Sequence, residues 1–431
     1  MPFLHFDEAK QAALTALRHW LVGAPPAVRA LLIVDLFGQL RLTLWSISAV
    51  DTAALDQVLS MDCGPWWTGE ILRVEQADQV TRDLYDGALE SARSDPDDLR
   101  LLVLDRHRSR TAWFASPGEP PWSAPEEGPP IVVFYSFKGG LGRSTLLASF
   151  ATQRSRAGER VGVLDFDLDS PGVGRLLSAD SSGLTARWGV VDFLLERFHA
   201  DLPLGDYYHR CDRVAGAGEI VVFPAGHLDE EYANKLAHVD LEEAPAAADS
   251  GLWELLHQVR DELKPNWILI DARTGLSEPA GQLLSGIAHL HVLLGTAQDQ
   301  SWQGLERVLD RLGRERVFAE RPQAEVLLVH AMVPVGDVGK LTREAFAAQA
   351  ERVFTDRYFA ATDEEGADDE RFWDTRDMDT RDAPHVPIPI EYDAKFASFG
   401  DIAEVADALC GGPYLTAAER IMGRFTTEAA A

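Results

Sequence analysis

The sequence predicts an α/β protein in which a mostly parallel sheet with helices on both faces follows a smaller α/β domain. Three observations support this prediction. After residue 131, short apolar runs alternate with amphipathic stretches, which is the pattern of parallel strands covered by helices. Before residue 116, apolar runs flank tight turns, as they do in hairpins. A proline-rich segment separates the two patterns.

Residues 1–115 are predicted to form the small α/β domain. Leu14, Leu17 and Leu21 recur at helical spacing after Asp7, a residue type that caps helices. The expected elements are a helix from about Asp7, a hairpin around 37–39, a helix over 76–93 and a hairpin over 99–116. No pattern of catalytic residues stands out in this domain, so the residues leave its role open.

Residues 116–130, with the sequence SPGEPPWSAPEEGPP, are predicted to form an extended linker. Proline lacks a backbone N–H and prevents both helix continuation and ladder pairing, so this stretch fits neither a helix nor a central strand. We therefore expect the domain boundary here, with a larger domain over 131–431.

The larger domain is predicted to contain alternating strands and helices. The loop after its first strand leads into a helix over 144–157, which Gly158 ends. The expected strands cover 131–136, 160–167, 219–226, 266–272, 290–297 and 325–334. All are short apolar runs, as expected for strands buried on both faces of a parallel sheet.

The net charge and hydropathy exclude several function classes. The 431 residues carry 40 Lys+Arg and 69 Asp+Glu, a formal charge of −29. Nucleic-acid binding depends on neutralising phosphates, so no nucleic acid partner is expected. No apolar run reaches the roughly 18–20 residues of a membrane span, and no secretory signal is recognisable, so we expect a cytoplasmic protein without membrane attachment. The acidic stretch 356–382 is either a solvated insertion or a partner-docking segment.

The cysteines and histidines form no metal-binding pattern. The three cysteines lie far apart without C-x-x-C spacing and are expected to be free thiols: Cys63, Cys211 and Cys410. Three histidines flank predicted strands at spacings that give no metal site: His289, His291 and His330.

A glycine-rich loop, FKGGLGRST over 137–145, joins the first strand of the larger domain to its helix. Glycines let backbone N–H groups curl around phosphate oxygens, and the start of a helix adds partial positive charge. The standard pattern G-x-x-x-x-G-K-[ST] is not met, because Arg143 precedes Ser144. The flanking strand and helix nevertheless predict a phosphate-binding site.

Carboxylates follow two of the predicted strands. Asp165 and Asp167 lie on one face of their strand because side chains alternate, and we expect them beside the loop. Asp271 ends another apolar run, and a carboxylate at the end of a buried strand indicates a functional residue. Asp169 is expected to cap the turn at 170–172.

These motifs resemble the ParA/MinD family of dimerising ATPases. KGGLGRS, with the early lysine Lys138, resembles the family's deviant Walker A loop, and arginine before the serine is similar to a branch found in multidomain bacterial proteins. LDFDLDSPG (164–172) resembles switch I, and WILIDARTGLSE (267–278) resembles the Walker B strand and switch II. The resemblance runs from about 131 to 410, and FPAG (223–226) and IEYD (390–393) are similar to family strand ends.

The resemblance implies a P-loop NTPase core with ATP and Mg²⁺ as cofactors. Asp167 would position the attacking water, Arg143 would bind the β and γ oxygens, and Lys138 would reach the phosphates of a second subunit. The implied magnesium ligands are Ser144, Asp165 and Asp271. The implied nucleotide-binding residues are Gly139, Gly140, Leu141, Gly142, Arg143, Ser144, Thr145 and Gly275.

The resemblance also implies a slow ATPase that forms a homodimer when ATP is bound and acts through a protein partner or an attached domain. Residues 1–115 are the candidate attached domain. A nucleotide-binding scaffold that does not hydrolyse ATP is the alternative, with Arg143 as the disabling change. Membrane association through the weakly amphipathic end, 415–425, is a third reading that its few cations disfavour. The residues leave ATP and GTP both open.

Overall fold

The computed structural model describes residues 5–46, 51–90, 92–107, 109–197, 203–239, 250–319, 321–359, 373–396 and 398–425. The chain divides into two compact units, Met1–Ser109 and Arg110–Ala431. Each unit is built around a sheet of its own. The acidic stretch 356–382 is described only in part, because 360–372 lie outside the described residues.

The first unit contains a mixed five-stranded sheet in the order β3-β2-β1-β5-β4. β1 pairs antiparallel with β2 and parallel with β5, while β2 pairs parallel with β3. The elements are α1 (Phe6–Gly23), β1 (Arg29–Val34), β2 (Leu40–Trp45), α2 (Ala53–Cys63), β3 (Trp67–Arg73), α3 (Gln79–Glu90), β4 (Arg93–Ser94) and β5 (Leu101–Asp105).

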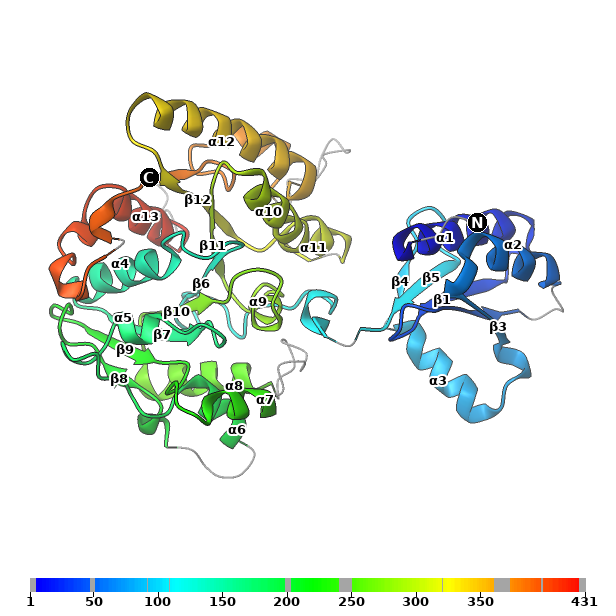
Figure 1. The fold of residues 1–431 in the computed structure, drawn as a ribbon, viewed down its shortest axis with the longest axis horizontal. Helices are drawn as coiled ribbons and strands as arrows, with labels where there is room; N and C mark the ends of the chain where they lie inside the picture. The colour runs from blue at the N-terminus through cyan, green and yellow to red at the C-terminus, as the bar shows by residue number, and fades with distance from the viewer. Residues whose placement is uncertain are drawn as a thin grey trace. The chain divides into compact units, whose positions relative to one another are not determined.

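Alternation along β1 produces two apolar layers in this unit. Leu32 packs with buried residues of α1 and α2, such as Leu17 and Leu59. Leu31, its neighbour in the strand, faces the opposite layer, where Tyr85 of α3 packs. Figure 1 shows α1 and α2 on one side of the small sheet and α3 on the other.

Three of the four elements predicted for residues 1–115 are confirmed. The helix begins at Phe6, the hairpin turns at 35–39, and α3 occupies the expected helical stretch. The hairpin expected over 99–116 is wrong. β5 pairs antiparallel with β4, which lies upstream, and the short 3₁₀ helix η3 (Thr111–Trp113) belongs to the second unit.

The indole of Trp113 explains why no return strand forms. It is buried, and its Nε1 donates to the carbonyl of Ser277 at 2.7 Å. The backbone N–H of Ala112 donates to the carboxylate of Glu278 at 3.1 Å. These contacts hold 111–113 against the start of α9, where pairing with β5 was expected.

Residues 116–130 lie within the second unit, so the division between Ser109 and Arg110 comes before the predicted linker. Trp122 is buried, and its carbonyl accepts from Nε2 of His289 at 2.7 Å. The N–H of Gly118 donates to the carbonyl of Ser285. The segment is irregular over 116–120 and forms a turn over 124–127, so the predicted extended path holds only in part. Some of its backbone groups bond to the rest of the second unit.

The second unit contains an eight-stranded sheet in the order β13-β12-β11-β6-β10-β7-β9-β8. All neighbours are parallel except β8 and β9. The strands are β6 (Ile131–Ser136), β7 (Arg160–Phe166), β8 (His209–Arg210), β9 (Glu219–Phe223), β10 (Trp267–Ala272), β11 (Leu290–Gly295), β12 (Val326–Val333) and β13 (Ile388–Glu391). The six predicted strands and the α/β fold class are thereby confirmed.

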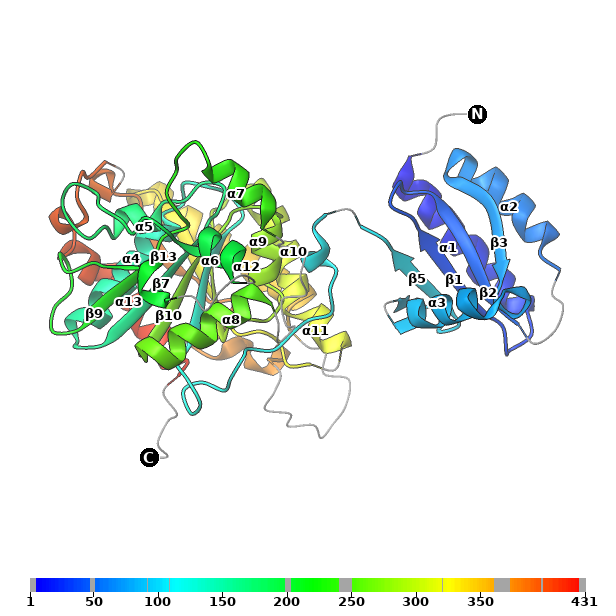
Figure 2. The same cartoon turned by 90° about the horizontal axis from the view of Figure 1, so that it is seen from below.

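Helices cover both faces of this sheet (Figure 2). On one face α4, α5 and α13 pack with Val132 and Phe134, and on the other α6, α8, α9, α10 and α12 pack with Val133 and Tyr135. The helices are α4 (Arg143–Arg156), α5 (Val173–Leu176), α6 (Val190–Glu196), α7 (Tyr232–His238), α8 (Gly251–Gln258), α9 (Glu278–Leu283), α10 (Asp299–Leu312), α11 (Arg314–Phe318), α12 (Gly336–Arg357) and α13 (Gly412–Gly423).

The strand order places β6 where the chain changes direction across the sheet. β7 and β9 follow on one side of β6, and β11, β12 and β13 lie on the other. In open α/β sheets, ligands bind beyond the carboxyl ends of the strands at such a switch point. The loop 137–142 leaves β6 at this position.

Candidate active site at the phosphate loop

The loop 137–142 offers an open, glycine-lined surface at the start of α4. Gly140 and Gly142 have φ of +77° and +82°, a left-handed conformation that glycine adopts without strain. A Cβ atom on Gly139, Gly140 or Gly142 would meet nothing within 4 Å. The backbone of the loop is therefore accessible, and the first N–H groups of the 14-residue helix α4 add positive potential.

The guanidinium of Arg143, the first residue of α4, contacts two carboxylates. Its Nε lies 2.5 Å from Oδ1 of Asp271, and its Nη2 donates to Oδ2 of Asp167 at 2.9 Å. Burial opposes the charged form, but these carboxylates outweigh it and raise the pKa of the guanidinium. The buried Nη1 has no hydrogen-bond acceptor within the described residues.

Ser144 and Asp271 lie side by side beneath the loop. The Ser144 hydroxyl donates to Oδ2 of Asp271 at 2.6 Å, and the Asp271 side chain is fully buried at the end of β10. Asp165, at the neighbouring end of β7, accepts from the N–H groups of Gly172 and Gly174. These hydroxyl and carboxylate oxygens are the hard ligands that suit Mg²⁺.

The two buried aspartates influence each other. Burial, followed by the charge of Asp271, raises the pKa of Asp165 to about 7. Burial also raises the pKa of Asp271, while the ion pair with Arg143 and the bond from Ser144 oppose that shift. The ion pair with Arg143 and the bond from Ser144 thus favour the ionised form of Asp271, whereas for Asp165 the backbone N–H groups of Gly172 and Gly174 favour it.

Asp167 is held by two arginines. Arg143 binds its Oδ2, while Nη1 of Arg273 donates to its Oδ1 at 3.0 Å. Nε of Arg273 also lies 3.4 Å from Oδ2 of Asp169. Asp169 thus faces an arginine, where a turn cap was expected.

The other residues expected at the phosphates surround the loop. Nζ of Lys138 donates to Oε1 of Gln298 at 2.8 Å within the same chain. Gly275 has φ +69°, and its carbonyl accepts from the hydroxyl of Tyr135 at 3.0 Å. That bond fixes the segment after β10 against β6.

A cavity of about 330 Å³ adjoins the loop on the side of β13. Leu141 and Thr145 line it together with aromatic residues from the last part of the chain, Tyr392, Phe396 and Tyr414. Sequence reasoning placed Leu141 and Thr145 at the nucleotide but missed the aromatic residues. IEYD over 390–393 was the signal in the sequence that pointed to this strand end.

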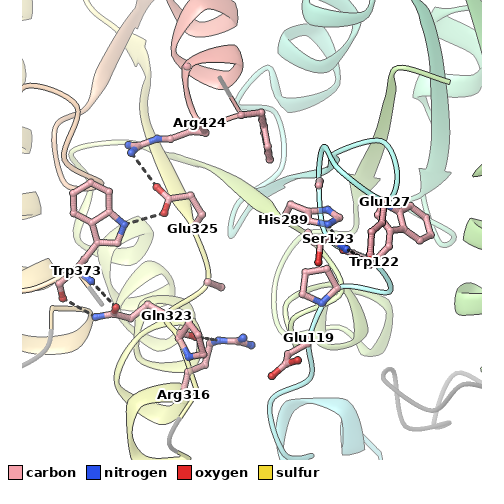
Figure 3. Close-up of a pocket in the computed structure, with 17 residues that line it drawn as sticks. Glu119, Trp122, Ser123, Glu127, His289, Arg316, Gln323, Glu325, Trp373 and Arg424 are labelled. Carbon is pink, nitrogen blue, oxygen red and sulfur yellow. Dashed lines mark hydrogen bonds and ion pairs between the residues drawn. The ribbon is translucent and has the colours of Figure 1, made fainter. Parts of the chain in front are cut away.

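A second and larger cavity, about 820 Å³, lies at the amino ends of the strands (Figure 3). Its polar side chains bind one another: Glu325 accepts from Nε1 of Trp373 at 2.8 Å and pairs with Arg424 at 3.0 Å. Nδ1 of His289 accepts from the N–H of Ile131. The bond from Nε2 of His289 to the carbonyl of Trp122 ties the segment 119–127 to the sheet, and the pair of Arg424 with Glu325 ties the end of α13 to it, at the edge opposite the phosphate loop.

The described residues show no cluster of three or more His, Cys, Asp or Glu side chains suited to a metal ion. The cysteines are free, as predicted, with Cys63 and Cys211 buried. Burial raises the pKa of the Cys63 thiol to about 11. Within the described ranges, every helix falls short of the length and hydropathy needed to cross a bilayer.

Comparison with known proteins points to the same site. Residues 129–192, which hold the loop and the Asp165–Asp167 segment, match the family model described as ParA, NUBPL iron-transfer P-loop NTPase. The chain is 34% identical over 98 residues to the cytosolic Fe-S cluster assembly factor cfd1 of Neurospora crassa, a match that covers 23% of this chain and 28% of that protein. It is 43% identical over 51 residues to nubp2 of Xenopus tropicalis, covering 12% and 19% respectively.

Two solved structures are also similar. The cell division ATPase MinD of Pyrococcus furiosus has a TM-score of 0.41 at 18% identity, and the ParA family ATPase of Chlorobium tepidum has 0.44 at 15%. Each match covers 68% of this chain and 98% of the other. Residues 129–192, which hold the loop and the first acidic strand end, are thus similar to the ParA family of P-loop NTPases.

Proposed function

We propose that this protein is an ATP- and Mg²⁺-dependent switch ATPase that dimerises when ATP is bound. The main support for this proposal is the environment of Arg143. It is a buried guanidinium at the start of α4 with one donor, Nη1, that has no acceptor among the described residues. A phosphate oxygen at the loop would satisfy that donor, and arginine binds phosphate with paired, charge-assisted bonds.

Nucleotide binding then requires Arg143 to exchange partners. The guanidinium would leave Asp271 and Asp167 and turn to the β and γ oxygens, while the backbone of Gly140 and Gly142 surrounds the phosphates. The cavity of about 330 Å³ beside Thr145 has aromatic walls suited to the flat face of a nucleoside base. Competition between ATP and GTP for binding tests which of the two bases, adenine or guanine, the cavity accepts.

Magnesium fits the oxygens that this exchange would release. Ser144 and Asp271 would hold the ion, with Asp165 beside them, and the bound ion would supply positive charge against the phosphate oxygens. Since Arg143 holds Oδ1 of Asp271, the ion and the arginine are alternative partners of the same carboxylate. Binding of the metal and binding of the nucleotide are therefore coupled.

Asp167 is the residue proposed to position the attacking water. The water oxygen bonds to the γ-phosphorus while the bond to the β–γ bridging oxygen breaks, and ADP leaves with that electron pair. Asp167 accepts the proton of the water and passes it to solvent. Phosphoryl transfer of this kind depends mainly on positioning and charge, which the loop and carboxylates supply.

The output of the switch is proposed to pass through dimerisation. Lys138 would leave Gln298 and reach the phosphates of a second copy, and the dimer would act in the cytoplasm on a protein partner or through the first unit. The similar proteins include cytosolic Fe-S cluster assembly factors. Their matches cover 28% and 19% of their own lengths, too little to carry a partner or a cargo over to this chain.

A non-hydrolysing nucleotide scaffold is the second candidate, and one observation favours it. Both carboxylate oxygens of Asp167 bind arginines, which compete with a water molecule for these oxygens in this arrangement. If Arg143 kept Asp167 when nucleotide binds, ATP would be held without turnover.

The proposed site for ATP and Mg²⁺ can be tested by equilibrium binding of ATP with and without Mg²⁺. We expect Mg²⁺ to lower the dissociation constant of ATP for the unaltered protein. In Ser144→Ala the factor by which Mg²⁺ lowers this constant should be at least about tenfold smaller. Ser182→Ala is the matched control, because its exposed hydroxyl donates to Asp180, outside the site. Equal Mg²⁺ dependence in Ser144→Ala and the control would contradict the proposed metal site.

A further inference from the structure

Arg273 is a charged residue at the site for which neither the loop motif nor the proposed reaction has a role. It follows Asp271 by two residues, just beyond the end of β10. Its side chain is 27% exposed, and it joins two carboxylates of the segment after β7. Its Nη1 lies 3.0 Å from Oδ1 of Asp167, and its Nε lies 3.4 Å from Oδ2 of Asp169.

The two arginines divide the carboxylate of Asp167 between them. Arg143 binds Oδ2 and Arg273 binds Oδ1, so each oxygen has one guanidinium partner. The two cations differ in their surroundings. Arg143 starts the helix that follows the loop and has a buried donor that meets no acceptor in the described part of the chain. Arg273 comes from a different strand end and binds Asp169 as well.

Phosphate binding therefore affects the two contacts differently. A phosphate at the loop attracts Arg143, which sits at the amino end of α4, and this frees Oδ2 of Asp167. Arg273 has Asp167 and Asp169 as its partners and is not part of the loop, so its contact with Oδ1 can persist. Departure of one arginine then exposes a single oxygen of a carboxylate that the other arginine still holds.

We propose that Arg273 is a positioning residue that holds Asp167 through Oδ1, so that Oδ2 faces the attacking water once Arg143 has moved to the phosphates. This inference rests on the proposed ATPase function. Oδ2 accepts the proton of the water as the new bond to phosphorus forms and the bond to the bridging oxygen breaks, with the electron pair leaving on ADP. Arg273 itself exchanges no proton and touches no substrate.

Asp169 anchors Arg273 from the other side. Its side chain is 49% exposed, and its contact with Nε is longer than the contact between Arg273 and Asp167. An exposed, longer ion pair contributes less than a buried, hydrogen-bonded one. Asp169→Asn should therefore lower the turnover number by less than a change of Arg273 does.

The test compares Arg273→Ala and Arg273→Lys with the unaltered full-length protein. The two quantities are the turnover number for phosphate release at saturating Mg²⁺·ATP and the dissociation constant of ATP. We expect Arg273→Ala to lower the turnover number about ten- to a hundredfold, the usual effect of losing a charge-assisted bond, and to leave the dissociation constant within about twofold. Arg273→Lys keeps the charge and should retain an intermediate turnover number.

Free guanidinium ion gives a readout that a structural role would not move. It should restore part of the turnover of Arg273→Ala by occupying the vacated place beside Asp167. Arg352→Ala is the matched control: Arg352 is an exposed arginine of α12 that pairs with Glu306 and Asp356. That variant should hydrolyse ATP at the unaltered rate and should not respond to guanidinium.

The outcomes separate the two proposals. Hydrolysis by the unaltered protein with an unchanged turnover number in Arg273→Ala overturns the role of Arg273 alone. A weaker dissociation constant with an unchanged turnover number shows a phosphate contact and also overturns it. No hydrolysis by the unaltered protein overturns the ATPase proposal and the role of Arg273 with it. If Arg273→Ala has a lowered melting temperature, Arg273→Lys, with its intermediate rate, decides the question.

Discussion

Arg143 and Asp271 form an ion pair in which the guanidinium is 9% exposed and the carboxylate is fully buried. The residue expected on the phosphates is thus the direct partner of the residue expected at the metal. Adjacent in sequence to Arg143, Ser144 binds the other oxygen of the same carboxylate. The start of α4 therefore holds both oxygens of Asp271, and any ligand that attracts Arg143 changes the environment of this carboxylate.

Replacing Arg143 should destabilise the protein in the absence of nucleotide. Arg143→Ala leaves Asp271 and Asp167 without their buried partner, and removing one member of a buried pair costs about 3–5 kcal/mol. Arg143→Lys keeps a charge near both carboxylates and should lose less. Urea unfolding monitored by tryptophan fluorescence measures this difference. An Arg143→Ala variant as stable as the unaltered protein would contradict the structural importance of the pair.

Lys138 should be needed for dimerisation more than for nucleotide binding. Its ammonium group binds Gln298 in this chain and is proposed to cross to a second copy. Lys138→Ala should bind ATP normally below the dimerisation concentration and lose ATP-dependent light scattering. Gln298→Ala is the control, because it frees Lys138 without removing it and should dimerise at least as well. If Lys138→Ala dimerises at the same ATP concentration as the unaltered protein, the cross-subunit role of Lys138 is refuted.

The two units are proposed to be separable at 106–110. Arg106 and Arg110 are exposed and flank the boundary, whereas 116–130 packs onto the second unit through Trp122. A protease of low specificity should therefore cut first within 106–110, and the fragment 110–431 should keep the melting temperature of the second unit. A first cut within 116–130 would show that this segment is not held by its contacts.

Acidification should destabilise the second unit through its buried histidines. Burial lowers the pKa of His291 to about 4, whereas an unfolded histidine titrates near 6.5. The unfolded chain binds more protons between these values, so the free energy of unfolding falls as pH falls from about 6.5 to 4, by about 3 kcal/mol from this group.

The variant His291→Gln removes this contribution while keeping a side-chain donor. Unfolding free energies measured at pH 7 and pH 4.5 should therefore differ less in His291→Gln than in the unaltered protein. His238→Gln, a change of an exposed histidine in α7, should leave the difference as it was. Identical pH dependence in all three proteins would contradict the buried, neutral state of His291.

Much of the second unit was predictable because its signals are local. Each buried strand is a short apolar run, and the loop between β6 and α4 carries its glycines in one continuous motif. Residues 111–113 were misassigned because their environment is not local: Trp113 is placed by Ser277, far along the chain. The same applies to 116–130, whose prolines indicate an extended path but not the surface on which it lies.

In the site, too, contacts between distant segments could not be predicted from local sequence signals. The positions of Asp165, Asp167 and Asp271 at predicted strand ends predicted that they lie beside the loop, because parallel strands end at one edge of a sheet. They did not predict which arginine each carboxylate binds, since that depends on side-chain conformations set by three separate strand ends. Arg273 stands two residues after Asp271 in the printed sequence, and only its ion pairs with Asp167 and Asp169 single it out.

Steady-state phosphate release by the unaltered protein and by Asp167→Ala tests the central proposal most directly. With saturating Mg²⁺·ATP, we expect slow release by the unaltered protein and a loss of at least about a hundredfold in Asp167→Ala, with ATP still bound. Asp62→Ala, an exposed aspartate of the first unit, should release phosphate at the unaltered rate. Equal phosphate release by the unaltered protein and Asp167→Ala would contradict the proposed ATPase mechanism.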